Sequence, residues 1–485
     1  MRLSRLLLSA MAALGPHATA FAATPTTAVT VYRGDDETLY AGDGGGPLRS
    51  GYAVVRETRR LALASGAQTQ VVDDLPAFVD AEALIFDPGA KVTVLSRRML
   101  AFGRSSAATL AGLIGHNANV VGEGGQLIAS GTVLRADETG LLVRGDDGTD
   151  QVVRHYAALR THTTLATGTR LELRLDAAQA GVVDAVMSYP TAGLGWRASY
   201  TAVLQPGDAC RLRLDAQAGI ANRSGRDWRA VKLTLIAGAP RIDENGGPRP
   251  MLKSTMAAPA SAAMDALPRQ APLDDYRSYT LPAPVALADG SLTLVPLYAP
   301  HTLTCERTTL YEIGNTWSPP RPVIAADFGA TGSGTVTGRL AFTAFDSLPA
   351  GKLRVLANDA EGTPQFIGEG RVDDTPKGAR VDLPLGTVFD LRAQHERTAF
   401  ELDRSSRSLD EGFRVTLHHA GATPRMVTVR VHPDRWRQWT LASASLKPAR
   451  QTPDLLEFRL AVPAGGATTL DYAIRYTWPA ELQPQ

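Results

Sequence analysis

Apolar and polar residues alternate along most of this 485-residue chain, and a period of two is typical of β-strands with one buried face. The clearest stretch runs from Arg211 to Asn222. The next residues, Asn222 to Gly225, predict a turn, because Asn and Gly tolerate the backbone angles that turns need. The alternation resumes from Trp228 to Ile236. We therefore expect an antiparallel hairpin over residues 211–236.

The C-terminal region repeats this pattern in four short sets. Several such strands within about 90 residues, separated by turn residues, predict an immunoglobulin-like sandwich over residues 396–485. The residues that share a face within each set are Phe413, Val415 and Leu417; Val427, Val429 and Val431; Leu456, Phe458, Leu460 and Val462; and Leu470, Tyr472, Ile474, Tyr476 and Trp478.

The rest of the chain also has the texture of β-structure, so the expected fold class is all-β, a multidomain β-sandwich with a small inserted β-barrel. One helix is expected at Ser105–Ile114, where Leu110, Leu113 and Ile114 would share a side. Residues rich in Ala, Pro, Ser and Met without a period predict a mobile loop. The expected segments are an N-terminal β domain at 23–104, the helix and small barrel at 105–165, a central β-sandwich region at 166–395 and the mobile loop at 246–275.

The N-terminus has the order of features found in secretory signal peptides. Arg2 and Arg5 precede the short apolar run Leu6–Leu14, and Ala20-Phe21-Ala22 supplies small residues at a cleavage site. The apolar run is shorter than the ~20 residues that span a bilayer. We expect residues 1–22 to be a signal peptide and the mature chain, without a membrane helix, to be periplasmic or secreted.

The expected mature chain is almost neutral. Removing residues 1–22 removes two arginines and no acids, so the formal net charge falls from +1 to −1. Interspersed charges of both signs give no electrostatic footprint for nucleic acid. The chain has two cysteines, Cys210 and Cys305, which could form a disulfide in an oxidising compartment or remain two buried thiols.

Motifs of common enzyme classes are absent from the sequence. There is no Gly-x-Ser-x-Gly nucleophile elbow and no Cys-x-x-Cys pair. His395-Glu396-Arg397-Thr398-Ala399 lacks the second histidine of a zinc protease motif. Thr337 stands where a dinucleotide loop starting at Gly332 would need glycine. We expect no catalytic, cofactor-binding or metal-binding residues.

Weaker signals are interpreted as surface features. His418 and His432 both point outward by alternation, but a hairpin turn at 420–424 would separate them by roughly 20 Å, at ~3.3 Å per residue, which is too far to share a metal. Residues 146–150 resemble a calcium loop but lack the glutamate and the length of an EF-hand. The tripeptides at 33–35 and 144–146 match a cell-adhesion motif and lie where turns are expected.

Three blocks of sequence carry a resemblance to a known family. They are Tyr189 to Tyr200, with the sequence YPTAGLGWRASY; Asn222 to Trp228, which leads into Leu233 to Gly238; and Leu348 to Val355, which continues through Gln365 to Glu369, Asp374 to Pro376 and Leu385 to Asp390. In order and spacing these blocks resemble the bacterial exported family catalogued as domain of unknown function 4139.

The resemblance runs from about Tyr52 to Trp478 and implies the β-fold and export, but no reaction. Related proteins are sometimes labelled mucoidy inhibitor-like and have a coiled coil. This chain has no sustained heptad repeat and therefore no expected coiled coil, so the role implied by that label is not expected for it. Within the blocks we expect Trp196, Tyr200 and Trp228 to fill the core; the alternative is a surface platform that stacks on a sugar or a peptide.

Two functions remain open from the sequence. The first is an exported, non-enzymatic cell-envelope protein that binds or scaffolds an envelope protein or a polysaccharide. The second is a secreted hydrolase whose two carboxylates act on a glycan, with Asp227, Glu369 and Asp390 as candidates. Trp436 and Trp439, near a predicted loop, are better candidates for the surface than the other tryptophans, although a core position is favoured for them too. The sequence indicates no oligomeric state.

Overall fold

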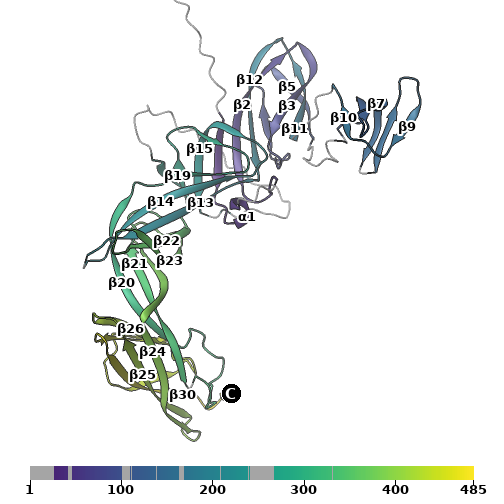
Figure 1. Cartoon of the computed structure of the whole chain (residues 1–485). Coiled ribbons are helices and arrows are strands. Elements are labelled where there is room, and N and C mark those ends of the chain that lie inside the picture. The colour runs from purple at the N-terminus through teal and green to yellow at the C-terminus, as the bar shows by residue number, and fades with distance from the viewer. Residues whose placement is uncertain are drawn as a thin grey trace, which may run out of the picture.

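The structure is a computed structural model, and it describes residues 27–41, 46–100, 110, 112–137, 139–162, 169–207, 209–238, 240, 267–329 and 331–485. The expected signal peptide at 1–22 and most of the expected helix at 105–114 lie outside these residues. Within them the chain is nearly all β, arranged in several sheets (Figure 1). This confirms the all-β class. None of the described helices is long and apolar enough to cross a membrane.

The first sheet has eight strands and holds the N-terminal part of the chain. Its one parallel pair joins the first strand to a strand of the central region, 200 residues later; the remaining pairs are antiparallel. In spatial order the strands are β16 (Arg269–Leu273), β17 (Tyr276–Thr280), β15 (Trp228–Ala237), β1 (Ala28–Tyr32), β2 (Ala53–Leu63), β12 (Gly181–Thr191) and β4 (Ile85–Asp87), with β18 (Val285–Leu287) on β15.

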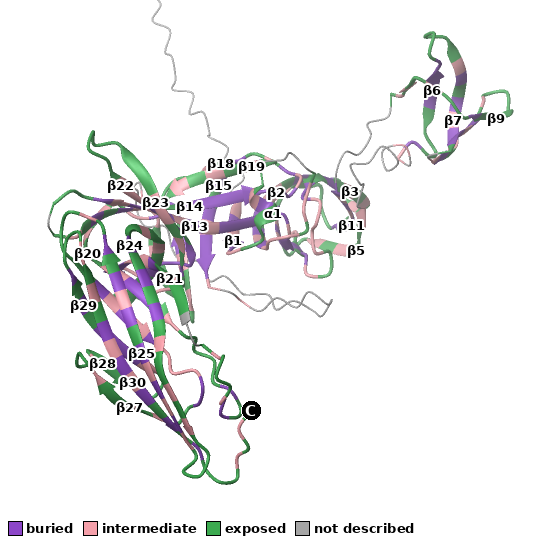
Figure 2. Ribbon diagram, turned by 60° about the horizontal axis from the view of Figure 1, so that its bottom comes forward, coloured by how far each residue is buried: buried purple, intermediate pink, exposed green. Residues whose placement is uncertain are grey.

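Two smaller sheets accompany it. A three-stranded sheet contains β3 (Gly66–Leu75), β11 (Thr169–Ala177) and β5 (Val92–Leu100). A five-stranded sheet with its own apolar core lies apart from the others (Figures 1 and 2), in the order β10 (Ala158–Arg160), β6 (Asn117–Val121), β7 (Leu127–Asp137), β8 (Gly140–Arg144) and β9 (Asp150–Val153). This sheet is open, because its outer strands β10 and β9 do not pair. The expectation of a small closed barrel was wrong.

The largest sheet has fourteen strands and runs through the central and C-terminal regions. Its main path is β23 (Pro364–Val372), β22 (Gly351–Asn358), β13 (Leu194–Leu204), β14 (Arg211–Asn222), β20 (His301–Ile313), β21 (Thr331–Thr343), β24 (Arg380–Asp403), β25 (Ser408–His419), β30 (Ala467–Thr477) and β27 (Trp439–Ala444). The remaining strands are β19 (Ser291–Pro296) on β14, β26 (Arg425–Val431) between β20 and β29 (Leu455–Val462), and β28 (Arg450–Thr452) on β29.

The expected hairpin over residues 211–236 is wrong, although both of its strands are where the alternation placed them. β14 pairs with β13, β19 and β20, whereas β15 pairs with β1, β17 and β18. The turn after Asn222 therefore carries the chain from one sheet to the other. The side-chain amide of Asn222 stabilises this crossing by donating to the carbonyls of Arg226 and Leu287, at 2.8 and 2.9 Å.

Two large apolar cores divide the main body of the protein. One joins the eight-stranded and three-stranded sheets to β13, β14, β22 and parts of β21 and β24. The other lies in the C-terminal region, between β24, β25 and β30 on one side and β26 and β29 on the other. The buried residues of these strands alternate with exposed ones (Figure 2).

Long strands pass between the two cores. β24 has 24 residues, of which Val381 and Leu383 belong to the first core and Leu391 and Ala393 to the second. The boundary expected at residue 395 therefore falls inside a strand. Arg269–Leu273 is β16, so the end of the expected loop at 246–275 is a strand; residues 246–266 lie outside the described part. A four-residue helix, α1 (Glu37–Tyr40), begins after the capping side chain of Asp36.

Candidate functional site

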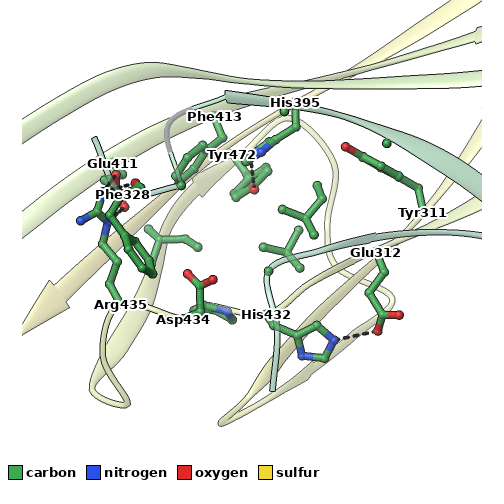
Figure 3. A pocket seen from close by; sticks show the side chains of 18 of the residues that line it. Tyr311, Glu312, Phe328, His395, Glu411, Phe413, His432, Asp434, Arg435 and Tyr472 are labelled. Atoms are coloured by element: carbon green, nitrogen blue, oxygen red, sulfur yellow. Dashed lines mark hydrogen bonds and ion pairs between the residues drawn. The ribbon is translucent and has the colours of Figure 1, made fainter. Parts of the chain in front are cut away.

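A cavity of about 270 Å³ lies at the C-terminal core, beside the loop that follows β20 (Figure 3). Its lining residues span more than 150 positions of the sequence. Most of them lie on β20, β24, β25 and β30 and on the segment after β26. Polar side chains beside an apolar core need hydrogen-bond or ion-pair partners. The polar and charged side chains that line it are Tyr311, Glu312, His395, Glu411, His432, Asp434, Arg435, Tyr472 and Tyr476.

A buried ion pair forms one wall of the cavity. Arg435 and Glu411 are each 2% exposed, and Arg435 donates to both carboxylate oxygens of Glu411, from Nε at 2.6 Å and from Nη2 at 2.8 Å. Arg397 donates a third hydrogen bond to Glu411, at 3.2 Å. Burial raises the pKa of Glu411, and the two guanidinium groups oppose this rise. Both oxygens of this carboxylate are therefore occupied.

Arg435 also fixes the loop between β20 and β21. Its Nη1 donates to the carbonyls of Val323 and Ala325, at 3.0 and 2.9 Å, and its Nη2 donates to the carbonyl of Phe328 at 2.7 Å. A guanidinium group has five N–H donors, so the two bonds to Glu411 and these three use all of them. The role of Arg435 is thus to clamp a loop onto the sheet.

A neutral histidine forms the second wall. His395 on β24 stacks on Phe413, with ring centroids 4.8 Å apart, and its Nε2 lies 3.1 Å from the hydroxyl of Tyr472. Burial lowers the pKa of His395 from 6.5 to about 4, because desolvation disfavours the charged imidazolium. This side chain is uncharged at neutral pH and can exchange a hydrogen bond with Tyr472.

Protonation of His395 is expected to destabilise the protein between pH 6.5 and pH 4. Its pKa is lower in the folded chain than in the unfolded chain, so over this range the unfolded state binds more protons and stability falls with pH. A shift from 6.5 to about 4 corresponds to about 3 kcal/mol of unfolding free energy at pH 4. In urea unfolding at several pH values, the unfolding free energy of His395→Asn should fall less between pH 6.5 and pH 4 than that of the wild type. His418→Asn, at an exposed histidine, serves as the control, and parallel curves for His395→Asn and the wild type would exclude this role.

Asp434, a third acid of the lining, differs from Glu411 in its hydrogen bonding. Asp434 makes no side-chain hydrogen bond or ion pair to another residue in the described part of the chain. Burial raises its pKa, although the hydrogen bond from its own backbone amide and the positive charge of Arg435 act in the opposite direction. Beside it, His432 is held between Glu312, at 2.9 Å, and the carbonyl of Asp454, at 3.1 Å. Figure 3 shows the Asp434 carboxylate directed into the cavity.

A family model described as a domain of unknown function, DUF4139, matches residues 186–480, which is more than half of the chain. The chain belongs to the DUF4139 family. Every residue of the cavity lies within the matched region. The match does not show a relationship to mucoidy inhibitor-like proteins. No curated protein matches the chain.

Three aromatic residues of the blocks that resemble DUF4139 are core residues, as expected: Trp196, Tyr200 and Trp228 are at most 2% exposed. The indole of Trp196 donates to the carbonyl of Ile236 at 2.9 Å, which ties β13 of the large sheet to β15 of the eight-stranded sheet. The hydroxyl of Tyr200 donates to the carbonyl of Pro349 at 2.6 Å.

The same blocks contribute to a second buried ion pair, far from the cavity in sequence. Arg226 donates to Glu57 at 3.0 Å and to the Tyr189 hydroxyl at 2.9 Å, and its guanidinium lies 4.3 Å from the ring centroid of Trp228. Burial alone would raise the pKa of Glu57, but Arg226 and Arg59 hold it below its usual value. These contacts give the DUF4139 blocks a structural role.

The acids proposed for hydrolysis are not brought together. Asp227 precedes β15 and accepts a hydrogen bond from the amide of Asp289 at 2.8 Å. Glu369 on β23 pairs with Arg354 at 2.9 Å. Asp390 is exposed on β24 and does not line the cavity that contains Glu411 and Asp434.

The surface assignment of the histidines is only partly right. β25 pairs with β24 and β30, and β26 pairs with β20 and β29, so the hairpin used to separate His418 from His432 does not exist. His418 is exposed, but His419 is buried, and His432 lines the cavity. In the described residues no group of three potential ligands could hold a metal ion.

The other weak signals are turns and ion pairs. Asp147 accepts a hydrogen bond from the Thr149 amide at 3.0 Å, and Asp150 pairs with Arg144 at 2.7 Å. In the tripeptide at 33–35, Arg33 pairs with Asp374 and Asp35 pairs with Arg371 at 3.1 Å. Both charged groups of the first tripeptide, and Arg144 of the second, are therefore engaged in ion pairs within the protein.

A disulfide joins Cys210, the residue before β14, to Cys305 on β20. Of the two tryptophans near the predicted loop, Trp436 is buried and Trp439 is half-buried, with its indole donating to the carbonyl of Pro453 at 2.7 Å. Neither forms an exposed stacking platform.

Sequence reasoning missed Glu411, Asp434 and Arg435. Glu411 carried a signal: on β25 it shares the inward face with Leu409, Phe413 and Val415, and a charged residue at a core position requires a charged partner. Asp434 and Arg435 lie in a segment without strand periodicity, between β26 and β27, and no local pattern points to them.

Proposed function

We propose that this chain is an exported, non-enzymatic protein of the bacterial cell envelope, periplasmic or secreted, and that it binds another envelope component through the cavity of Figure 3. The order of charged, apolar and small residues at 1–22 supports export. A protein or a polysaccharide is the expected class of partner.

The observation that carries the proposal is the state of Asp434. A carboxylate that is partly removed from water without a pairing group costs free energy, and burial has raised its pKa accordingly. It borders a cavity of about 270 Å³. A bound ligand that contacts this carboxylate would offset the cost, so the arrangement favours binding.

The fold supports this proposal. We propose that residues 396–485, with the ends of β20, β21 and β24, form an immunoglobulin-like sandwich, because their two strand layers share one apolar core. A second sandwich in the central region would use the first core. Such architectures expose loops and strand ends to partners, and the cavity lies beside the loop after β20.

The alternative, a glycan hydrolase, needs one carboxylic acid and one available carboxylate that face each other. Asp434, with its raised pKa, has the properties of the acid. Of the other two carboxylates of the lining, Glu411 has both oxygens held by Arg435 and Arg397, and Glu312 is bonded to His432 at 2.9 Å. Both of these carboxylates are therefore engaged rather than available as a base or a nucleophile, and binding is the better proposal.

The mature protein should retain one component of a solubilised envelope fraction, or one cell-wall or surface polysaccharide, in a pull-down. Asp434→Asn should abolish that retention, whereas Glu396→Gln should not. Glu396 is the neighbour of His395 on β24, but it is exposed on the opposite face, which makes it a matched control. Shortening of a polysaccharide during the incubation would instead favour the hydrolase.

A further inference from the structure

We propose that the cavity of Figure 3 accepts a primary alkylammonium group, namely a lysine side chain of a protein partner. This inference rests on the proposed binding function and names the chemistry of its ligand. Four features support it: the charges around the cavity, the carboxylate left without a partner, the apolar walls and the absence of a metal-ligand cluster in the described residues.

The charged groups of the cavity leave a surplus of one negative charge. Glu312, Glu411 and Asp434 are the acids of the lining, and Arg435 is its one guanidinium. Arg397 adds a second positive charge from outside the lining, at Glu411. Counted over the carboxylates and guanidinium groups alone, three acids against two guanidinium groups leave one negative charge. A cationic ligand would therefore complete the local balance.

Among the described residues, Asp434 is the lining carboxylate that makes no hydrogen bond or ion pair with another side chain. Glu411 is paired with two arginines, and Glu312 is bonded to His432 at 2.9 Å. Arg435 is the chain neighbour of Asp434, but all five of its N–H groups donate to Glu411 and to the three carbonyls of the loop. The Asp434 carboxylate faces the cavity (Figure 3), and among the described residues the hydrogen-bond donor to it is its own backbone amide.

The cavity also provides the surroundings that an ammonium group on an alkyl chain needs. An ammonium group donates three hydrogen bonds and accepts none, and a tyrosine hydroxyl can accept; Tyr311, Tyr472 and Tyr476 are residues of the lining. The faces of aromatic rings attract cations. Ile313, Val431 and Ile474 provide aliphatic contacts for the methylenes of the chain.

Two other cations fit less well. A metal ion would need several oxygen or nitrogen ligands, and the described residues contain no group of three that could hold one. An amino sugar carries ring hydroxyls that need partners on all sides, whereas a large part of this lining is aliphatic or aromatic. A lysine side chain is a compact charge on a four-carbon stem and needs polar partners at its end alone.

The test uses the mature full-length protein and Nα-acetyl-lysine amide as the probe, titrated by calorimetry or by NMR. Saturable binding is expected, and Nε-acetylation of the probe should abolish it, because acetylation removes the charge. Asp434→Asn should weaken binding by about tenfold or more, the usual loss for a hydrogen bond between charged groups. Glu396→Gln should bind as the wild type does.

Equal binding of the lysine probe and its Nε-acetylated form would overturn the inference without any variant, so a folding defect in Asp434→Asn cannot obscure the result. Binding of glucosamine in place of the lysine probe would overturn the assignment to a protein partner. If the pull-down retains an envelope component equally on the wild type and Asp434→Asn, the ammonium site is wrong but the binding function stands. If nothing is retained, the proposed function fails.

Discussion

Replacement of Arg435 by alanine is expected to lower the unfolding free energy of the C-terminal region by about 3–5 kcal/mol, the usual cost of removing one partner from a buried ion pair. Glu411 would keep a buried carboxylate with only Arg397 beside it. The carbonyls of Val323, Ala325 and Phe328 would also lose their donor. Arg435→Lys should not restore stability, because an ammonium group cannot reproduce the guanidinium fork.

Urea unfolding of the full-length chain would measure this loss, with Arg475→Ala as the control. Arg475 pairs with Asp410, the residue before Glu411, at 2.7 and 2.9 Å, but this pair lies on the outer face of the sheet. An exposed pair contributes about 1 kcal/mol or less. Equal losses for the two variants would show that the buried pair has no special role in stability.

Removal of the disulfide is expected to cost about 4–5 kcal/mol of unfolding free energy. The bond joins cysteines that are 95 residues apart, and in the chain-entropy account a loop of ~100 residues restricts the unfolded chain by this amount. The double variant Cys210→Ala/Cys305→Ala should therefore unfold at a lower guanidinium concentration than the oxidised wild type.

The redox state supplies the control for this prediction. A reducing agent should move the wild-type transition close to that of the double variant and leave the double variant unchanged. The two thiols are not joined in solution if the wild type unfolds at the same guanidinium concentration as the double variant and a reducing agent does not change this concentration. The backbone hydrogen bond from the Cys305 amide to the Cys210 carbonyl, at 3.0 Å, is independent of the sulfur atoms and should remain in both.

The sequence predicts the strands of this protein better than it predicts their partners. Period-two alternation reports which face of a strand is buried, and for Arg211–Asn222 the expected and observed bounds coincide. It does not report which sheet a strand joins. The turn at 222–225 has the composition of a hairpin turn, yet it connects two sheets, and Asn222 donates hydrogen bonds to the carbonyls of Arg226 and Leu287 at this crossing.

The same error affected the histidines. The turn at 420–424 lies between β25 and β26 and has the length of a hairpin loop, but each strand pairs elsewhere. The alternation itself was informative. Extended by two residues in both directions from Phe413, Val415 and Leu417, it places Glu411 and His419 on the inward face, and both are buried.

The rest of the candidate site could not be predicted from one sequence. Arg435 acts on Glu411, 24 positions away, and on carbonyls more than 100 positions away. These contacts depend on how the loop after β20 folds back against the segment after β26. The loop binds Arg435 through backbone carbonyls. Every residue has such a carbonyl, so no pattern of side chains marks this loop as the partner of an arginine.

The strands shared by the two cores also determine how the molecule would respond to a pulling force. β24 alone, with 24 residues, extends roughly 80 Å at ~3.3 Å per residue, and β20 and β21 run beside it from one core toward the other (Figure 1). Tension between the N-terminal sheets and the C-terminus would load the hydrogen bonds of these strands in shear, many at once. The central region would therefore resist extension through many backbone hydrogen bonds at once.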